Sequence, residues 1–413
     1  MPPDKSIAHR SAMFAAITDG LSEIKNYSEA ADPQSTLLCL RKLGIEIETI
    51  DSGILKIKGV GRNGFKEPDS ILDCGNSGTT MRLLSGILAG AGVPCVLTGD
   101  ESLSKRTMKR IITPLQQMGA EISAREDNYA PLEIGPNSGI KALRFPLPIP
   151  SAQLKSCVLL AALYGEEKTI VIESEISRDH TERLLDLPVE IFGTERRITS
   201  DKHHAIPPQN YSIPGDFSAA SFWLAAGAIH KRAHLRLKST GINPTRSAFL
   251  NILEQMGAEI EIQNEIMEGK EPVADITVKS SELKNVDLPG HLVSNCIDEI
   301  PVMMVAMCFA EGISTIRGAG ELRHKETDRL AAMKNILSKA GARFEITEDS
   351  VTIEGNPGFV PDSTEYESEH DHRIAMSAAV MSLMAQKESV VKNSDCTDIS
   401  YPGFWHDLVE LSQ

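Results

Sequence analysis

The stretch Leu250–Ile262, LNILEQMGAEIEI, contains the pattern on which our prediction of the fold depends. Apolar residues at helical spacing end at Gly257, and an acidic residue and a β-like run follow. A glycine directly after an amphipathic helix is typical of the C′ position, where the backbone turns left-handed. Similar copies occur at Leu43–Glu46, Met118–Glu121, Ala340–Arg343 and, more weakly, Phe192–Glu195. The chain is therefore built from a repeated unit.

A second, more apolar helix is expected in each unit. These helices are predicted at residues 8–19, 78–91, 152–164, 217–230, 300–311 and 373–386. They are apolar nearly all round, so we expect them to be buried. Each unit then consists of a strand, a buried helix, a strand, an outer helix and further strands. Six units predict an α/β protein with two domains of three units each, 1–213 and 214–413, because the fourth unit begins near Pro214.

The composition of the chain limits the kinds of molecule that it is expected to bind. The chain has 413 residues and a formal net charge of −15, and this acidity argues against nucleic acid and membrane partners. Its seven cysteines are scattered without a Cys-x-x-Cys pair, which predicts reduced thiols, no zinc site and a cytoplasmic protein. The start does not resemble a signal peptide, and the apolar stretches are interrupted by Gly, Ser or charge, so no membrane span is expected.

Polar motifs lie where the buried helices are expected to begin. They are Lys5-Ser6, Gly75–Thr79, Ser151–Gln153, Asp216–Ser218, Asp298-Glu299 and Asp371–Arg373. Backbone N–H groups at a helix start favour anions. If the buried helices of both domains point toward one cleft, these starts form a local site for an anionic substrate.

The stretch Lys325–Arg329 adds two cations and an acid within about one helical turn. A helix would place Lys325 and Arg329 on one face, with no carboxylate between them there. Together with Glu326, this pattern predicts an anion site at which protons are transferred.

These residues resemble 5-enolpyruvylshikimate-3-phosphate synthase, a family of enolpyruvyl transferases, over nearly the whole chain. The matching motifs are Asp4–Arg10, Leu72–Arg82, Arg106, Ser151–Gln153, Asp298, Lys325–Arg329 and Asp371–Arg373. The resemblance implies two domains, each of three βαβαββ units around buried parallel helices, an inside-out α/β barrel. It implies transfer of the enolpyruvyl group of phosphoenolpyruvate to the 5-hydroxyl of shikimate 3-phosphate in the shikimate pathway, with no cofactor and no metal.

The resemblance also implies individual roles. Asp298 is expected to be the base for the hydroxyl, and Glu326, helped by Lys5, the acid at the methylene carbon. The substrate-binding residues are expected to be Lys5, Ser6, Arg10, Asn76, Gly78, Arg106, Ser151, Ala152, Gln153, Arg178, Asp298, Lys325, Arg329 and Arg373. Among them, Arg106, Arg329 and Arg373 are assigned to phosphoenolpyruvate. A guanidinium meets phosphate and carboxylate bidentately, which agrees with that assignment.

Taken singly, these residues have simpler explanations. Lys325 and Arg329 could pair with Glu321 or Asp328 on an exposed helix. Asp298, Asp371 and Ser151 could be helix N-caps. The glycines at 75 and 78 could serve only a tight turn.

The chain departs from the family pattern at three places. Ile399 occupies a position that is often Lys, and Ala152 one that is Ser in some relatives. Only four residues precede Lys5, so we expect a shortened N-terminus and an unpaired sheet edge in the second domain.

Two rival functions remain. The sister transferase acting on UDP-N-acetylglucosamine typically has Lys-Asn near its start and a catalytic Cys in a mobile loop. Here the start is Lys5-Ser6, and Gly99–Arg106 contains no Cys. The other rival is a non-catalytic phosphometabolite sensor. A monomer is expected, and Gly78 predicts sensitivity to the inhibitor glyphosate.

Overall fold

A computed structural model of the chain describes residues 1–411. They form two compact units. The N-terminal unit contains Pro3–Ile213 and the short segment Glu268–Glu271. The C-terminal unit contains Met1–Pro2, Pro214–Met267 and the described chain from Pro272 onward. Each unit has its own hydrophobic core.

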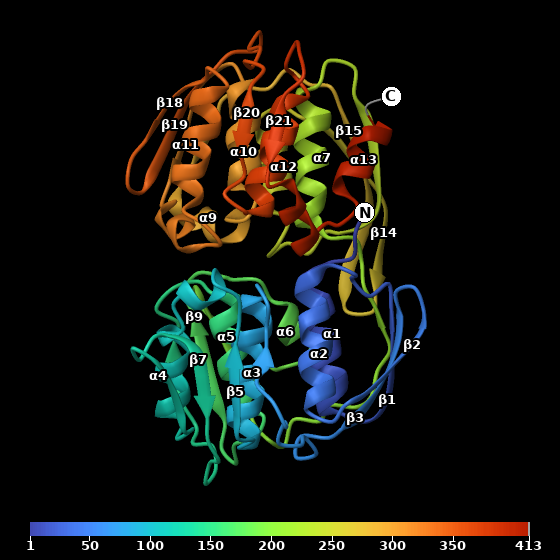
Figure 1. Cartoon of the computed structure of the whole chain (residues 1–413), viewed down its shortest axis with the longest axis vertical. Coiled ribbons are helices and arrows are strands. Elements are labelled where there is room, and N and C mark those ends of the chain that lie inside the picture. Colours follow the sequence, from blue (N-terminus) through green and yellow to red (C-terminus); the bar gives the residue numbers. More distant parts are fainter. Residues whose placement is uncertain (412–413) are drawn as a thin grey trace. The chain divides into compact units, whose positions relative to one another are not determined.

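The N-terminal unit has three buried helices, three outer helices and three four-stranded sheets (Figure 1). The buried helices are α1 (Lys5–Ile17), α3 (Gly78–Ala91) and α5 (Ala152–Ala162), and the outer ones are α2 (Ala31–Lys42), α4 (Lys109–Gln117) and α6 (His180–Leu185). The sheets have the strand orders β12-β1-β3-β2, β4-β5-β7-β6 and β10-β11-β9-β8. Their strands are β1 (Asp19–Lys25), β2 (Glu46–Asp51), β3 (Ile54–Val60), β4 (Leu72–Asp73), β5 (Cys95–Thr98), β6 (Ile122–Arg125), β7 (Tyr129–Ile134), β8 (Arg144–Pro146), β9 (Thr169–Glu173), β10 (Val189–Phe192), β11 (Glu195–Ser200) and β12 (Tyr211–Ser212).

The same plan recurs in the C-terminal unit. Its buried helices α7 (Phe217–Ile229), α10 (Ile300–Cys308) and α12 (His372–Ser382) pack against one another (Figure 1). The other helices are α8 (Ala248–Gln255), α9 (Gly290–Cys296), α11 (Arg329–Lys339) and α13 (Phe404–Leu411). The sheets have the orders β13-β15-β14, β16-β17-β19-β18 and β20-β21. Their strands are β13 (His234–Gly241), β14 (Glu259–Glu268), β15 (Glu271–Lys279), β16 (Asp287–Leu288), β17 (Gly312–Arg317), β18 (Arg343–Ile346), β19 (Ser350–Gly355), β20 (Glu365–Glu367) and β21 (Val390–Lys392).

The repeats within both compact units share one strand arrangement. A short strand pairs in parallel with the strand that follows the buried helix, as β4 does with β5 and β16 with β17. An antiparallel hairpin then completes the sheet, as β6 and β7 do beside β5. In the first repeat of the N-terminal unit, the short strand is β12, which lies at the end of the segment Pro3–Ile213. It pairs in parallel with β1.

Small residues in the buried helices allow their backbones to approach closely. A Cβ atom added to Gly86 of α3 would lie 2.3 Å from the carbonyl oxygen of Cys157 in α5. Such a distance is too short for any side chain, so glycine is needed at this contact. The glycine in the middle of α3 therefore has a packing cause.

The predicted α/β repeats and all six buried helices are confirmed, within a few residues at their ends. Gly44, Gly119, Gly257 and Gly341 follow outer helices with φ between 78 and 93°. The prediction for Phe192–Glu195 as another helix end is wrong, because Gly193 forms the turn between β10 and β11. The outer helix α6 of that unit instead ends at Asp186, which adopts the left-handed conformation with φ 53°.

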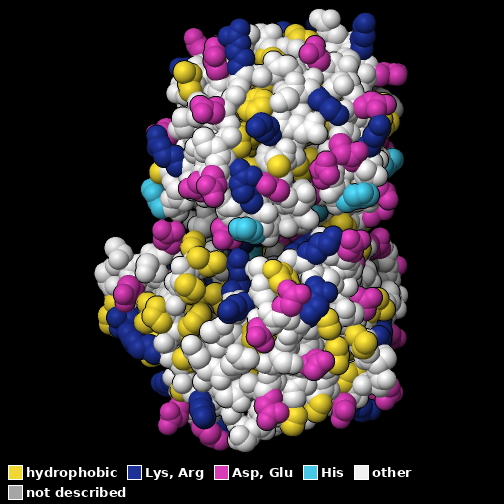
Figure 2. All heavy atoms as spheres, turned by 60° about the vertical axis from the view of Figure 1, so that its left-hand side comes forward, with side chains coloured by type: hydrophobic (Ala, Val, Ile, Leu, Met, Phe, Trp, Pro, Cys, Tyr) yellow, Lys and Arg dark blue, Asp and Glu magenta, His cyan; other side chains and the backbone are white. Residues whose placement is uncertain are grey.

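The surface mixes acidic and basic side chains over both units in the view of Figure 2. Within residues 1–411, no single helix has the length and apolar composition needed to cross a membrane, and only the bent pair α9 and α10 passes that test together. The angle between those two helices is 111°, and every residue of α10 is buried in the core.

Candidate active site

In the N-terminal unit, Lys5 is the first residue of α1, and its ammonium group is held in position by a carboxylate. Asp4 caps the helix by accepting from the backbone N–H of Ile7 at 2.9 Å. The Lys5 Nζ atom lies 3.0 Å from Oδ2 of Asp32 in α2. The Lys5 side chain is 16% exposed, so its ammonium group can reach a ligand while Asp32 holds it in place.

Arg10, one turn further along α1, is buried and held by uncharged oxygens. Its Nε donates to Thr181 Oγ1 at 2.8 Å, Nη1 to the carbonyl oxygen of Ser6 at 3.0 Å and Nη2 to Ser156 Oγ at 3.0 Å. Burial lowers the pKa of Arg10 to about 10, and the nearby Arg178 acts in the same direction although carboxylates oppose it. A guanidinium buried in this way stabilises a bound anion strongly.

The glycine-rich loop before α3 organises Arg106. The Asn76 side-chain oxygen accepts from Arg106 Nη2 at 2.6 Å, and its backbone carbonyl accepts from Nη1 at 3.2 Å. Gly78 begins α3 and is buried, with Ser77 as its N-cap. A Cβ atom at Gly78 would lie 2.7 Å from Nη1 of Arg82. Glycine therefore keeps the start of α3 open beside two guanidinium groups.

The start of α5 is connected to α3 by Gln153. The Oε1 atom of Gln153 accepts from Arg82 Nη1 at 2.6 Å, and Nε2 donates to Thr79 Oγ1 at 2.9 Å. Ser151 caps α5 by accepting from the Leu154 N–H at 3.4 Å, and Ala152 is the first helical residue. The starts of α3 and α5 thus lie together, as the sequence predicts.

In the C-terminal unit, the prediction that Lys325 and Arg329 share a helix face is wrong. Lys325 follows the 3-10 helix Gly320–His324, and Arg329 is the first residue of α11. Asp328 interrupts any common helix because its side chain caps α11 by accepting from the Ala331 N–H at 2.9 Å. Both cations nevertheless approach one carboxylate: Asp298 Oδ1 lies 3.3 Å from Arg329 Nη1 and 3.7 Å from Lys325 Nζ.

Arg329 is almost fully buried among carboxylates, contrary to the expectation of unpaired cations. Its Nε lies 2.8 Å from Asp371 Oδ2, and its Nη2 lies 2.5 Å from Glu326 Oε2. Burial alone would lower the pKa of Arg329, but Asp371, Glu326 and Asp298 outweigh it and raise this pKa above its ordinary value. Asp371 also caps α12 by accepting from the N–H of Arg373, so its structural and its charge-pairing roles coexist.

Asp298 lies between α9 and α10 and is surrounded by cations. Besides Lys325 and Arg329, Arg373 Nη2 lies 3.8 Å and Arg246 Nη1 4.0 Å from its Oδ2 atom. Its side chain remains 15% exposed, and that of Glu326 21%. Two partly exposed carboxylates among several cations form a setting in which protons can be exchanged with a bound anion.

Four polar residues without a predicted role hold the predicted ones, and two of them, Asp32 and Arg246, lie outside every motif quoted above. Asp32 pairs with Lys5, Arg82 contacts Gln153, and Arg246 and Glu299 pair with each other at 3.0 Å beside Asp298. The Asp298-Glu299 pair at a helix start was visible in the sequence. Arg246 had no such signal, because its partner lies 53 residues away.

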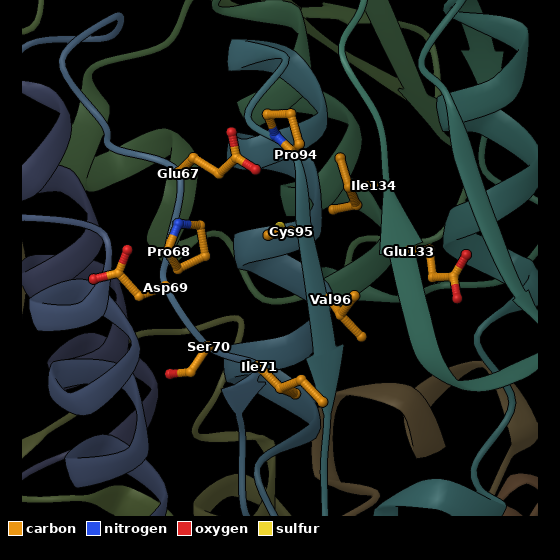
Figure 3. A pocket seen from close by; sticks show the side chains of 10 residues that line it. All are labelled: Glu67, Pro68, Asp69, Ser70, Ile71, Pro94, Cys95, Val96, Glu133 and Ile134. Atoms are coloured by element: carbon orange, nitrogen blue, oxygen red, sulfur yellow. The ribbon is translucent and has the colours of Figure 1, made fainter.

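A surface pocket in the N-terminal unit is a poor alternative site. It has a volume of about 350 Å³ and is lined by residues 67–71, 94–96, 133 and 134, none of which belongs to the predicted site. Its acidic side chains Glu67, Asp69 and Glu133 would repel an anion. In Figure 3 the carboxylates of Asp69 and Glu133 point in different directions, so they do not converge on a ligand.

One group of three possible metal ligands lies close together within residues 1–411. It consists of His406, Asp407 and Glu410 on α13 and includes no predicted site residue.

Comparisons with known proteins match nearly the whole chain to one family. A family model described as EPSP synthase (3-phosphoshikimate 1-carboxyvinyltransferase) matches residues 1–408. A 3-phosphoshikimate 1-carboxyvinyltransferase of Salinibacter ruber is 49% identical over 415 residues, covering 100% of this chain and 96% of that protein. One from Synechococcus sp. strain WH7803 is 45% identical over 422 residues, covering 100% and 94%.

Solved structures lead to the same family. EPSP synthase from Acinetobacter baumannii matches with a TM-score of 0.86 and 40% identity, covering 100% of this chain and 94% of that one. The enolpyruvyl transferase NikO from Streptomyces tendae has a TM-score of 0.75, covering 99% and 93%, but its 14% identity supports the fold alone. The chain belongs to the EPSP synthase family, the 3-phosphoshikimate 1-carboxyvinyltransferases.

Proposed function

We propose that this protein transfers the enolpyruvyl group of phosphoenolpyruvate to the 5-hydroxyl of shikimate 3-phosphate and releases phosphate. The observation that carries the proposal is the position of Asp298, which lies within 4.0 Å of Lys325, Arg329, Arg373 and Arg246. The first three belong to the motifs shared with the family. A carboxylate in this position can exchange a proton while the cations hold an anionic donor.

The acceptor is assigned mainly to the N-terminal unit. Ser6, Arg10, Ser151 and Gln153 bind shikimate 3-phosphate, with Arg178 and with Lys325 of the C-terminal unit. The buried Arg10 supports this assignment, because a guanidinium fixed by Ser156 and Thr181 can meet a phosphate without first losing conformational freedom. Asn76 and Ala152 contribute through their positions at the starts of α3 and α5.

The donor is assigned to the arginines that a planar or forked anion requires. Arg106, Arg329 and Arg373 bind phosphoenolpyruvate, with the backbone at Gly78 close to its phosphate. Lys5 contacts both substrates.

The chemistry then needs proton transfers at two atoms of the substrates, the 5-hydroxyl oxygen and the methylene carbon. Asp298 takes the proton of the 5-hydroxyl as its oxygen bonds to C2 of phosphoenolpyruvate. Glu326, with Lys5, donates a proton to the methylene carbon, and a tetrahedral ketal results. In the second step Glu326 takes a proton back from the new methyl group and the C2–O bond to phosphate breaks as the double bond reforms. The proton that Asp298 took from the hydroxyl passes to the departing phosphate, which restores the base. The arginines stabilise the charge on the departing phosphate.

Phosphate release from phosphoenolpyruvate tests the proposal when it is measured with three acceptors. We expect release with shikimate 3-phosphate and none with UDP-N-acetylglucosamine or without an acceptor. Release only with UDP-N-acetylglucosamine would assign the chain to the sister reaction. Binding of shikimate 3-phosphate without any release would make it a sensor.

Glyphosate inhibition is a further part of the proposal. Gly78 leaves space beside Arg82 and Arg106 that a Cβ atom would take from one side. We expect glyphosate to inhibit phosphate release, and Gly78→Ala to weaken that inhibition. A cytoplasmic location and a monomeric state are also proposed, and size-exclusion chromatography tests the second.

A further inference from the structure

A buried polar cluster lies directly behind Arg373 in the C-terminal unit, and the reaction described above assigns no role to two of its members, Ser218 and Glu299. The cluster consists of Ser218 in α7, Arg246 in the turn before α8, and Glu299 immediately before α10. Ser218 is 2% exposed, Arg246 3% and Glu299 0%. Burial of two opposite charges is costly unless they are paired and hydrogen-bonded, so this arrangement needs an explanation.

Glu299 accepts hydrogen bonds from two sides through one oxygen. Arg246 Nη1 donates to its Oε1 atom at 3.0 Å, and the Ser218 hydroxyl donates to the same atom. The turn that presents Arg246 is closed by Asn243, which accepts from the N–H of Thr245 at 2.9 Å and whose carbonyl accepts from the N–H of Arg246 at 2.8 Å. The turn therefore fixes the backbone position of Arg246, and the Arg246 guanidinium offsets the charge of Glu299.

Ser218 transmits this arrangement to Arg373. Since its hydroxyl proton is donated to Glu299, its oxygen is oriented to accept, and Arg373 Nη1 donates to it. The same Nη1 donates to the carbonyl oxygen of Asp298 at 3.1 Å, and it lies 3.9 Å from Glu299 Oε1. One end of the Arg373 guanidinium is thus fixed on three sides.

We propose that Glu299, acting through Ser218, is a positioning residue that orients Arg373 for phosphoenolpyruvate, and that Arg246 is its counter-charge. The inference rests on the proposed function, because it assigns Arg373 to that substrate. A guanidinium held at one end presents its remaining N–H groups in a fixed direction, which favours bidentate binding of a carboxylate or phosphate.

Ser218→Ala tests the proposal without changing any charge. Removal of the hydroxyl should raise the KM for phosphoenolpyruvate roughly tenfold, as expected for loss of a hydrogen bond to a charged group. The KM for shikimate 3-phosphate should stay within about twofold. Ser221→Ala is the matched control, since Ser221 is a buried serine of the same helix whose hydroxyl donates to the carbonyl oxygen of Ser218. It should change neither KM.

A pair of charge variants separates positioning from stability. Glu299→Gln should raise the KM for phosphoenolpyruvate on the order of 10- to 100-fold and lower the midpoint of urea unfolding, because Arg246 loses its partner. Adding Arg246→Gln should recover part of the unfolding midpoint while the KM for phosphoenolpyruvate stays high. A purely structural role would instead restore both quantities together.

Several outcomes would overturn the inference. They are a Ser218→Ala variant that matches Ser221→Ala, an equal rise of both KM values, or recovery of the KM in the double variant. If the unmodified chain releases no phosphate with shikimate 3-phosphate, the proposed function fails, and this assignment fails with it. Normal release by the unmodified chain, combined with any of the former outcomes, overturns the positioning role alone.

Discussion

Arg10 in the N-terminal unit and Arg329 in the C-terminal unit are both buried, yet opposite surroundings hold them. Arg10 donates to two hydroxyls and a carbonyl oxygen, whereas Arg329 donates to the carboxylates of Asp371, Glu326 and Asp298. Burial lowers the pKa of Arg10 to about 10, while the three carboxylates raise that of Arg329 despite its burial.

The difference indicates a division of labour. The hydrogen bonds of Arg10 go to neutral groups, although Glu182, Asp4 and Glu271 lie near enough to oppose the lowering of its pKa, so a bound phosphate can still supply a directly bonded counter-charge. Carboxylates bonded to a buried cation can exchange protons beside a substrate that the same cation helps to hold. We therefore expect the N-terminal unit to hold the anionic acceptor and the C-terminal unit to transfer protons.

The largest expected effect follows from removing the proposed base. Asp298→Asn keeps the shape of the side chain but removes its ability to take a proton at neutral pH. We expect kcat to fall by a factor on the order of 10² to 10⁴ in the phosphate-release assay, with little change in either KM. Near-normal turnover would refute the role of Asp298.

Stability should distinguish the two arginines. Arg329→Met leaves the fully buried Asp371 without its main cation and should lower the free energy of unfolding by about 3–5 kcal/mol. Arg10→Met should cost about 1–3 kcal/mol, because Ser156 and Thr181 can still bond to each other at their present 2.7 Å. Urea unfolding measures both, and equal losses would contradict the contrast.

A smaller effect is expected when the shape of a cation is changed and its charge kept. Arg373→Lys removes the planar fork, so the KM for phosphoenolpyruvate should rise about tenfold and exceed any rise for shikimate 3-phosphate. Arg10→Lys should have the reverse preference. Steady-state kinetics with each substrate varied in turn would expose an error if both variants weakened the same substrate.

The smallest effect concerns His9, a fully buried residue of α1 whose Nδ1 lies 2.6 Å from Thr36 Oγ1. Burial, with Lys5 and Arg10 nearby, holds the pKa of His9 well below its ordinary value. The unfolded chain then binds the proton that the folded chain excludes. Stability should therefore fall as the pH drops below about 6.5, by at most roughly 1.4 kcal/mol per pH unit.

His9→Asn should remove this contribution to the pH dependence of urea unfolding between pH 5 and 7. The matched control is His406→Asn, because the His406 side chain is 73% exposed. An unchanged slope in His9→Asn would show that other groups cause the pH dependence.

Local patterns in the sequence were enough to predict much of the fold. The apolar composition of α3 and α5 indicated buried helices, and Gly257 marked the end of α8, because composition and backbone conformation act over a few residues. The Lys325–Arg329 helix was wrong although a local signal existed. An Asp directly before a helix is a typical N-cap, and Asp328 begins α11 in this way. The chain therefore starts a new helix at Arg329 and does not continue one helix from Lys325.

Charge pairing was much less predictable. The carboxylates around Arg329 come from three different places in the chain, and Arg246 meets Glu299 across 53 residues. Spacing within a motif contains no information on such long-range partners. Resemblance to the family identified the residues shared with it, but gave no role to Arg82 or Glu299 and did not point to Asp32 or Arg246.

The division of labour is tested most directly by one double variant, Asp298→Asn with Glu326→Gln, examined by calorimetry with shikimate 3-phosphate and by phosphate release. We predict a dissociation constant for shikimate 3-phosphate within about threefold of the unmodified value, together with a loss of turnover on the order of 10³-fold or more. Retained turnover, or loss of acceptor binding in parallel with turnover, would contradict the account.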